Sequence, residues 1–67
     1  MIVIDIHRTG TEYLVVRTSK GRAKPEWISC GSREELAAVL GVLGVVDAEV
    51  ADVLRLLESS PDVEVRV

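Results

Sequence analysis

The chain has 67 residues, of which 48% are hydrophobic, and it contains one tryptophan, one tyrosine, no phenylalanine and one cysteine. This length fits one domain over residues 1–67, and the single cysteine excludes an intrachain disulfide. The formal net charge of −3 differs from the basic balance of a typical nucleic-acid-binding domain, and Met1, His7 and Cys30 are too few soft ligands for a closed zinc site, so we expect neither a metal nor a cofactor.

The first thirty residues have the pattern of strands. Ile2, Ile4 and Ile6 alternate with other side chains, which predicts a half-buried strand. Thr9-Gly10-Thr11 predicts a turn, in which the glycine is free to adopt a positive φ. Two further strands are expected on either side of a polar and basic connection, over residues 12–18 and 26–29.

The periodicity then changes to that of two amphipathic helices. Ser32 followed by Glu35 is a capping box, and Gly44 suits the left-handed position after a helix, so the first helix lies between them. Asp47 is the expected N-cap of the second helix, which Pro61 ends. Apolar residues recur at i, i+3, i+4 and i+7 in both, as Leu36, Val39, Leu40 and Leu43 and as Val50, Val53, Leu54 and Leu57.

A last strand is predicted by the alternation of Val63, Val65 and Val67 with charged residues. The element order β-β-β-α-α-β predicts an α+β fold, a four-stranded antiparallel sheet with a helical hairpin packed on one face. Two antiparallel helices return the chain to the rim of the sheet where they began, so the last strand runs antiparallel to the first. We expect the strand order 4-1-2-3, and the order 1-2-3-4 is the alternative.

The second expected strand is apolar on both of its faces. Because a strand alternates its side chains between two faces, Tyr13 and Val15 point one way, and Leu14 and Val16 the other. A hairpin of helices covers one face of the sheet and leaves the other for another chain or as an exposed apolar patch. We expect Val3, Tyr13 and Val15 to lie on this uncovered face.

The apolar surplus predicts a small non-enzymatic protein-interaction module. We expect a homodimer, or a complex with a larger protein that the chain regulates or inhibits, because a chain this short gains stability from association. Val3, Tyr13 and Val15, or a strand edge, would make the contact, and Trp27 is either a contributor or the bulkiest core residue. Inhibitors of nucleic-acid enzymes encoded by phages and mobile elements have a similar size and charge.

The alternative function is nucleic-acid binding. The sequence has one basic cluster, and Trp27 follows it. Basic side chains beside an aromatic platform bind single-stranded nucleic acid. The cluster consists of Arg17, Lys20, Arg22 and Lys24.

Cys30 and His7 are the candidates for chemistry. Cys30 precedes a helix N-terminus, where a thiol is activated in some enzymes, but acidic residues fill the first helical turn. We therefore expect a buried structural cysteine. His7 lies on the same strand face as Asp5, and we expect a surface or interface histidine. No catalytic set is recognisable, so we expect no enzyme activity.

The opening residues predict a strand rather than a signal peptide. No apolar run approaches the roughly 20 residues that a membrane-spanning helix needs. We therefore expect no membrane association and a cytoplasmic location, where a lone thiol stays reduced.

Overall fold

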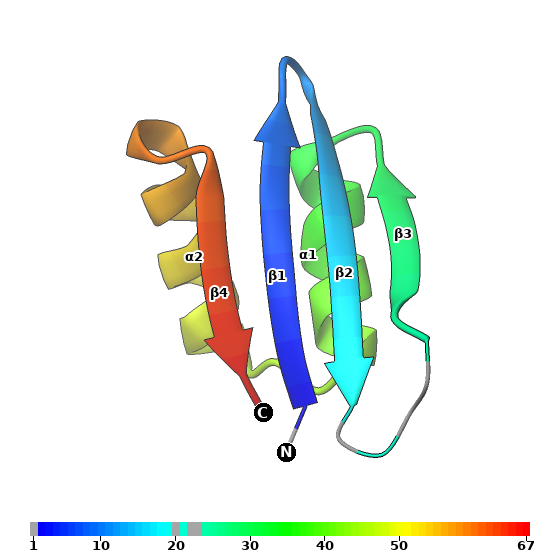
Figure 1. The fold of residues 1–67 in the computed structure, drawn as a ribbon. Coiled ribbons are helices and arrows are strands. Elements are labelled where there is room, and N and C mark those ends of the chain that lie inside the picture. Colours follow the sequence, from blue (N-terminus) through cyan, green and yellow to red (C-terminus); the bar gives the residue numbers. More distant parts are fainter. Residues whose placement is uncertain (1, 20, 22–23) are drawn as a thin grey trace.

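The fold is the expected α+β arrangement. The computed structural model describes residues 2–19, 21 and 24–67. Its elements in chain order are β1 (Ile2–Thr9), β2 (Glu12–Ser19), β3 (Glu26–Cys30), α1 (Arg33–Val42), α2 (Asp47–Ser59) and β4 (Asp62–Arg66). The strands form one antiparallel sheet in the order β3-β2-β1-β4, which confirms the 4-1-2-3 arrangement (Figure 1).

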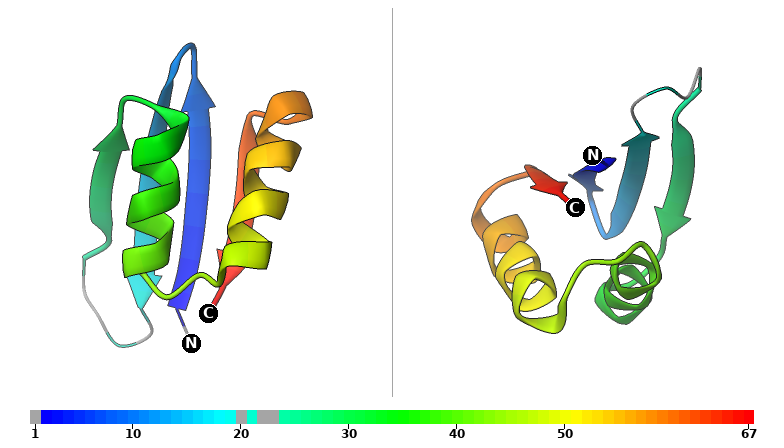
Figure 2. Two further views of the ribbon diagram at one scale, coloured as in Figure 1. Left: turned by 180° about the vertical axis from the view of Figure 1, so that it is seen from behind. Right: turned by 90° about the horizontal axis from the view of Figure 1, so that it is seen from below.

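The molecule has two layers. Both helices lie on the same side of the sheet and so stand in front of it when the molecule is seen from behind, with α2 beside β4 (Figure 2). The opposite side, which faces the viewer in Figure 1, has no helix over it. The sheet therefore has one helix-covered face and one uncovered face.

The turn between β1 and β2 is one residue shorter than expected. The ladder continues to the pair Thr9–Glu12, so only Gly10 and Thr11 lie in the turn. Gly10 has φ of 64°, and a positive φ at the first of two central residues is the pattern of a type II′ hairpin turn. This turn fixes the register along the whole β1–β2 ladder.

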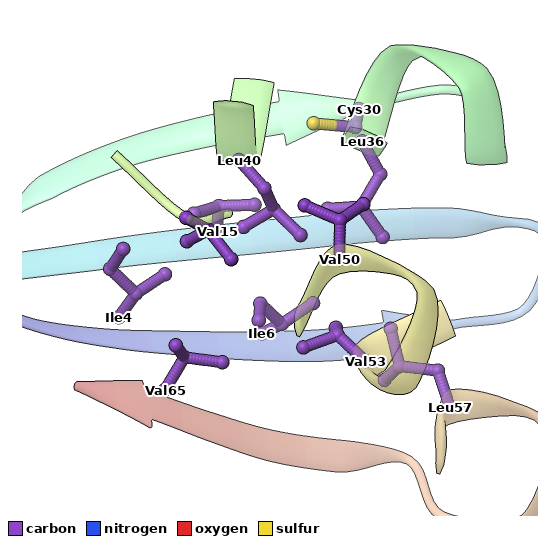
Figure 3. Close-up of a cluster of buried hydrophobic side chains, with 11 residues drawn as sticks. Ile4, Ile6, Val15, Cys30, Leu36, Leu40, Val50, Val53, Leu57 and Val65 are labelled. Carbon is purple, nitrogen blue, oxygen red and sulfur yellow. The ribbon is translucent and has the colours of Figure 1, made fainter. Parts of the chain in front are cut away.

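The register sends alternate residues of β2 to the helix-covered face. Val15 is the direct partner of Ile6, and partners in an antiparallel pair share a face. Val15 and Ile6 are both fully buried, in a core that Leu36 and Leu40 of α1 complete from the helix side (Figure 3). Three residues of α2, Val50, Val53 and Leu57, belong to the same core.

The expectation that Tyr13 and Val15 lie on the uncovered face is wrong. Val15 has no exposed surface, and Tyr13 packs against the core from the helix-covered face. The physical reason is the turn: a three-residue turn at Thr9-Gly10-Thr11 would put Val15 on the face of Asp5, whereas the observed two-residue turn puts it on the face of Ile6.

The start of α1 confirms the capping box in part. The Ser32 side chain accepts a hydrogen bond from the backbone N–H of Glu35, at 3.1 Å. The carboxylate of Glu35 accepts instead from the N–H of Gly31, at 2.9 Å, one residue before the expected donor. Both contacts satisfy backbone donors at the junction between β3 and the helix.

The two helices meet at a glycine turn. The N–H of Gly44 donates to Gly41 and the N–H of Val45 donates to Leu40, which is the bonding of a Schellman motif. Gly44 has φ of 100°, as its expected left-handed role requires. Val45 follows it into the core, with 3% of its surface exposed.

The start of α2 differs from the expected one. Asp47 is the first helical residue rather than the N-cap, and the N-cap Val46 makes no side-chain capping bond. Asp47 and Glu49 still lie in the first turn, where negative charge interacts favourably with the helix dipole.

The β1–β2 register predicts that the same substitution at two neighbouring residues of β2 changes the free energy of unfolding by different amounts. Val15→Asp should lower the free energy of unfolding by about 4 kcal/mol or more, because it places an unpaired carboxylate in the core. Leu14→Asp, on the uncovered face, should lower it by about 1 kcal/mol. Urea unfolding followed by circular dichroism measures both, and equal losses would contradict the register.

The N-terminal cap of α1 makes a second prediction. Ser32→Ala removes the acceptor for the N–H of Glu35 and should lower the free energy of unfolding by about 1 kcal/mol. Ser59→Ala is the control, because the hydroxyl of Ser59 donates to the carbonyl of Leu56 at the C-terminal end of α2 and caps no N–H group. Thermal unfolding measures both variants. If Ser32→Ala lowers the free energy of unfolding no more than the control does, the assigned cap is contradicted.

Candidate functional site

The uncovered face carries a patch of apolar side chains from three adjacent strands. Val3 lies on β1, Leu14 and Val16 on β2, and Trp27 on β3; we call these four residues the apolar patch. Trp27 is 64% exposed and pairs directly with Val16, which is only 9% exposed although it stands outside the main core. Since no helix covers Val16, its neighbours on the sheet must shield it.

The apolar patch differs in part from the residues expected from the sequence. Val3 lies on the uncovered face as expected, and Trp27 lies on the same face. The exposure of Trp27 shows that it is not a core residue. Leu14 and Val16 replace Tyr13 and Val15 on this face, because the two-residue turn differs by one residue from the expected turn and so exchanges the two faces of β2. The signal that would have found them is glycine at the first position of a two-residue hairpin turn, which is the preference of type II′.

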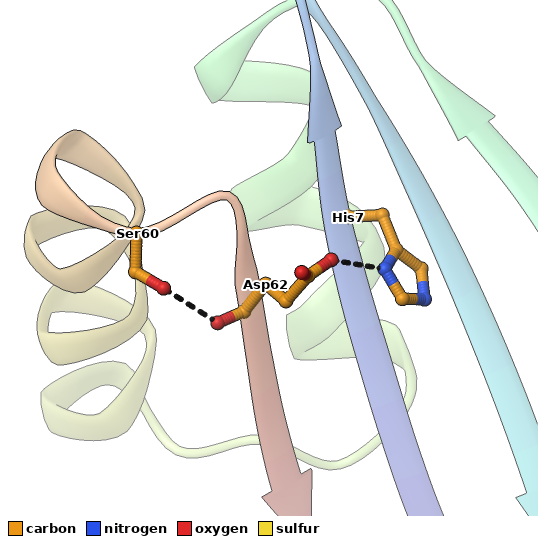
Figure 4. Close-up of polar contacts among 3 residues, drawn as sticks. All are labelled: His7, Ser60 and Asp62. Atoms are coloured by element: carbon orange, nitrogen blue, oxygen red, sulfur yellow. Dashed lines mark hydrogen bonds and ion pairs between the residues drawn. The ribbon is translucent and has the colours of Figure 1, made fainter.

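The other half of the uncovered face is charged. His7 on β1 pairs with Asp62 on β4, with 2.5 Å between Nδ1 and Oδ1, so its partner is Asp62 and not Asp5 (Figure 4). The Ser60 hydroxyl donates to the backbone carbonyl of Asp62 at 3.0 Å. Further along β4, Arg66 donates to Glu64 at 3.0 Å. The face is thus divided between an apolar side toward β3 and an ionic side toward β4.

Arg17, the first residue of the basic cluster, does not share a surface with Trp27. Arg17 pairs with Ile4 in the register and so lies on the helix-covered face, where its guanidinium donates to Glu26 at 2.5 Å. Lys24 is exposed, whereas Lys20 and Arg22 lie outside the described residues. Arg17 and Trp27 therefore point to opposite faces of the sheet.

A shallow apolar pocket of about 230 Å³ lies between β3 and α1. Ile28 of the edge strand forms one wall, and four residues from the C-terminal half of α1 and its cap form the rest: Ala38, Val39, Val42 and Leu43. Val42 is 87% exposed beside this pocket. Apolar surface thus continues around the β3 edge, from Trp27 on one face to Val42 on the other.

The opposite edge of the sheet has a different character. A groove of about 350 Å³ lies between β4 and α2, and its lining is half charged and half apolar: Glu49, Asp52, Glu64 and Arg66 with Val53, Leu56, Val63 and Val65. The side chains that β4 presents on the uncovered face are also charged. Charged edge residues discourage pairing with another strand.

Cys30 is a buried residue, as expected. Its side chain is 1% exposed and belongs to the core under the start of α1. Burial raises the pKa of the Cys30 thiol, and the nearby negative charge of Glu35 raises the pKa further. Both effects disfavour the thiolate, which is the nucleophilic form.

Metal-binding clusters and membrane-spanning helices are both absent from the described residues. Residues 2–19, 21 and 24–67 contain no group of three or more His, Cys, Asp or Glu side chains placed to hold a metal ion. Within the same residues, neither helix is long and apolar enough to cross a membrane.

Comparison with known protein families, with characterised proteins and with solved structures finds no match to this chain.

The raised pKa makes a prediction about Cys30. At neutral pH the folded protein should react with iodoacetamide at least about tenfold more slowly than the same chain unfolded in urea, because burial protects the thiol and keeps it protonated. The rate should rise with pH only above the range of an ordinary thiol. A fast reaction at pH 7 in the folded state would contradict this placement.

Proposed function

We propose that the protein is a non-enzymatic protein-interaction module that acts as a homodimer and, in that form, regulates or inhibits a larger protein. The observation that carries this proposal is the apolar patch on a sheet face that no helix covers, with Trp27 64% exposed at its border. Tryptophan is one of the residues enriched among those that contribute most of the binding energy at protein interfaces.

The distribution of charge supports association through the β3 side. The apolar patch and the pocket beside Val42 both border β3, whereas β4 presents mainly charged side chains. Two copies that carry a net charge of −3 each repel one another least where the contact surface is uncharged. The β3 side is therefore the surface best suited to a second copy.

The acidic helices offer a different surface to a larger protein. Glu34, Glu49 and Glu58 are exposed on α1 and α2, and these helices lie on the other side of the sheet from the uncovered face. Arg33 pairs with Glu58 at 3.0 Å and offsets part of this charge. A regulated partner would then present a basic surface to the helices, while the β3 side makes the homodimer.

Nucleic-acid binding, the alternative expected from the sequence, gains no supporting observation from residues 2–19, 21 and 24–67. Its aromatic platform and Arg17 lie on opposite faces, and Arg17 is engaged by Glu26.

The homodimer is tested by sedimentation equilibrium over a range of protein concentrations. The unmodified chain should form a dimer, and Trp27→Ala should raise its dissociation constant by about thirtyfold, the effect of losing an interface residue that contributes ~2 kcal/mol. Leu56→Ala is the matched control, because Leu56 is also half exposed but lies on α2 away from β3. A monomer at every concentration, or equal effects of the two variants, would contradict the proposal.

A further inference from the structure

Backbone hydrogen bonds identify which groups of β3 point away from the sheet. Both the N–H and the C=O of Ile2 bond to Val67, so the even-numbered residues of β1 face β4. Backbone groups alternate in direction along an antiparallel strand. Following this alternation through the β1–β2 and β2–β3 registers leaves the N–H and C=O groups of Trp27 and Ser29 directed outward from the β3 edge.

This free edge has defined ends. Pro25, which precedes β3, has no N–H to offer. Gly31, which follows β3, already donates its N–H to the Glu35 carboxylate at 2.9 Å. The donors available to another strand on β3 are therefore those of Trp27 and Ser29.

The β4 edge is protected where the β3 edge is not. The same alternation directs the backbone groups of Asp62, Glu64 and Arg66 outward, so each outward position of β4 carries a charged side chain. The carbonyl of Asp62 is also occupied by the Ser60 hydroxyl. On β3 the outward positions carry Trp27 and Ser29, which are uncharged, and such an edge is a template for strand pairing.

We propose that β3 pairs antiparallel with β3 of a second copy, centred on Ile28, to join the two sheets into one of eight strands. This inference rests on the proposed homodimer and specifies its interface. In this register Trp27 lies opposite Ser29 of the second copy, and each copy donates two hydrogen bonds and accepts two. Pro25 lies opposite Gly31 of the second copy, so the end without an N–H meets the end whose N–H is already used.

The side chains on both faces of β3 also fit those of the second copy in this pairing. On the uncovered face, the large side chain of Trp27 adjoins the small side chain of Ser29 from the other copy. On the helix-covered face, Ile28 meets its own copy on the two-fold axis and brings together the two apolar pockets, each with an exposed Val42. Glu26, the charged residue of β3, is neutralised by Arg17 of the same copy.

A proline substitution tests the pairing through the backbone alone. Ser29→Pro removes an outward N–H and leaves the β2–β3 ladder of the monomer intact, because proline is tolerated on an edge strand where its position faces solvent. Half of the intermolecular hydrogen bonds are lost, so the dissociation constant should rise about ten- to hundredfold in sedimentation equilibrium. Glu64→Pro is the matched control, an outward position on β4 that should leave the dimer unchanged.

A cysteine substitution gives a second test that does not depend on proline being tolerated. In a Cys30→Ala background, Ile28→Cys places two thiols on the two-fold axis with Cα atoms about 4.5 Å apart, within the range of a disulfide. Mild oxidation should yield a covalent dimer. Val63→Cys, a half-buried position on the same sheet face of β4, should remain monomeric on a non-reducing gel.

The outcomes separate this inference from the proposed function. A dimer that resists Ser29→Pro and fails to cross-link through Ile28→Cys, but is broken by Leu14→Asp, would overturn pairing through β3 and retain the homodimer, now formed face to face. A chain that is monomeric at every concentration would overturn both. Loss of the dimer in Ser29→Pro with retention in Glu64→Pro, together with cross-linking through Ile28→Cys, supports both.

Discussion

The two-residue turn at Gly10 and Thr11 determines which side chains of the sheet the helices cover. Because partners in an antiparallel ladder share a face, this turn sets Val15 beside Ile6 and directs both inward. The same register directs Val16 outward. A turn longer by one residue would exchange the two faces of β2 and place different side chains on the surface. The surface available to a partner is thus fixed by a local feature of the backbone.

The elements and their order were predictable because each has a strong local signal. Ser32 marks the start of α1 and Gly44 its end, through hydrogen bonds and a backbone conformation that the residue types themselves favour. The antiparallel direction of β4 followed from two helices that each cross the sheet once and so return the chain to the same rim. The position of β4 beside β1 was a choice between two edges, and that choice was correct.

The face assignment was harder to predict because apolar residues occupy both faces of β2. A pattern of Tyr-Leu-Val-Val has no alternation that indicates the buried side, so the register depended entirely on the turn length. Trp27 was ambiguous for a related reason, since its burial depends on which face β3 presents to α1. Edge exposure depends on strand order and helix placement together, which only the assembled fold provides.

The resulting molecule has two edges of opposite character. The β4 edge carries charged side chains, and the β3 edge is bordered by Trp27 on one face and by the pocket beside Val42 on the other. This asymmetry follows from the strand register. A register shifted by one residue would direct other side chains of β3 toward the helices. The most direct measurement is therefore of the register itself, by nuclear Overhauser contacts between α-protons in β1 and β2. We expect a strong contact between Ile6 and Val15, whereas a contact between Asp5 and Val15 in its place would contradict the assigned faces and every surface derived from them.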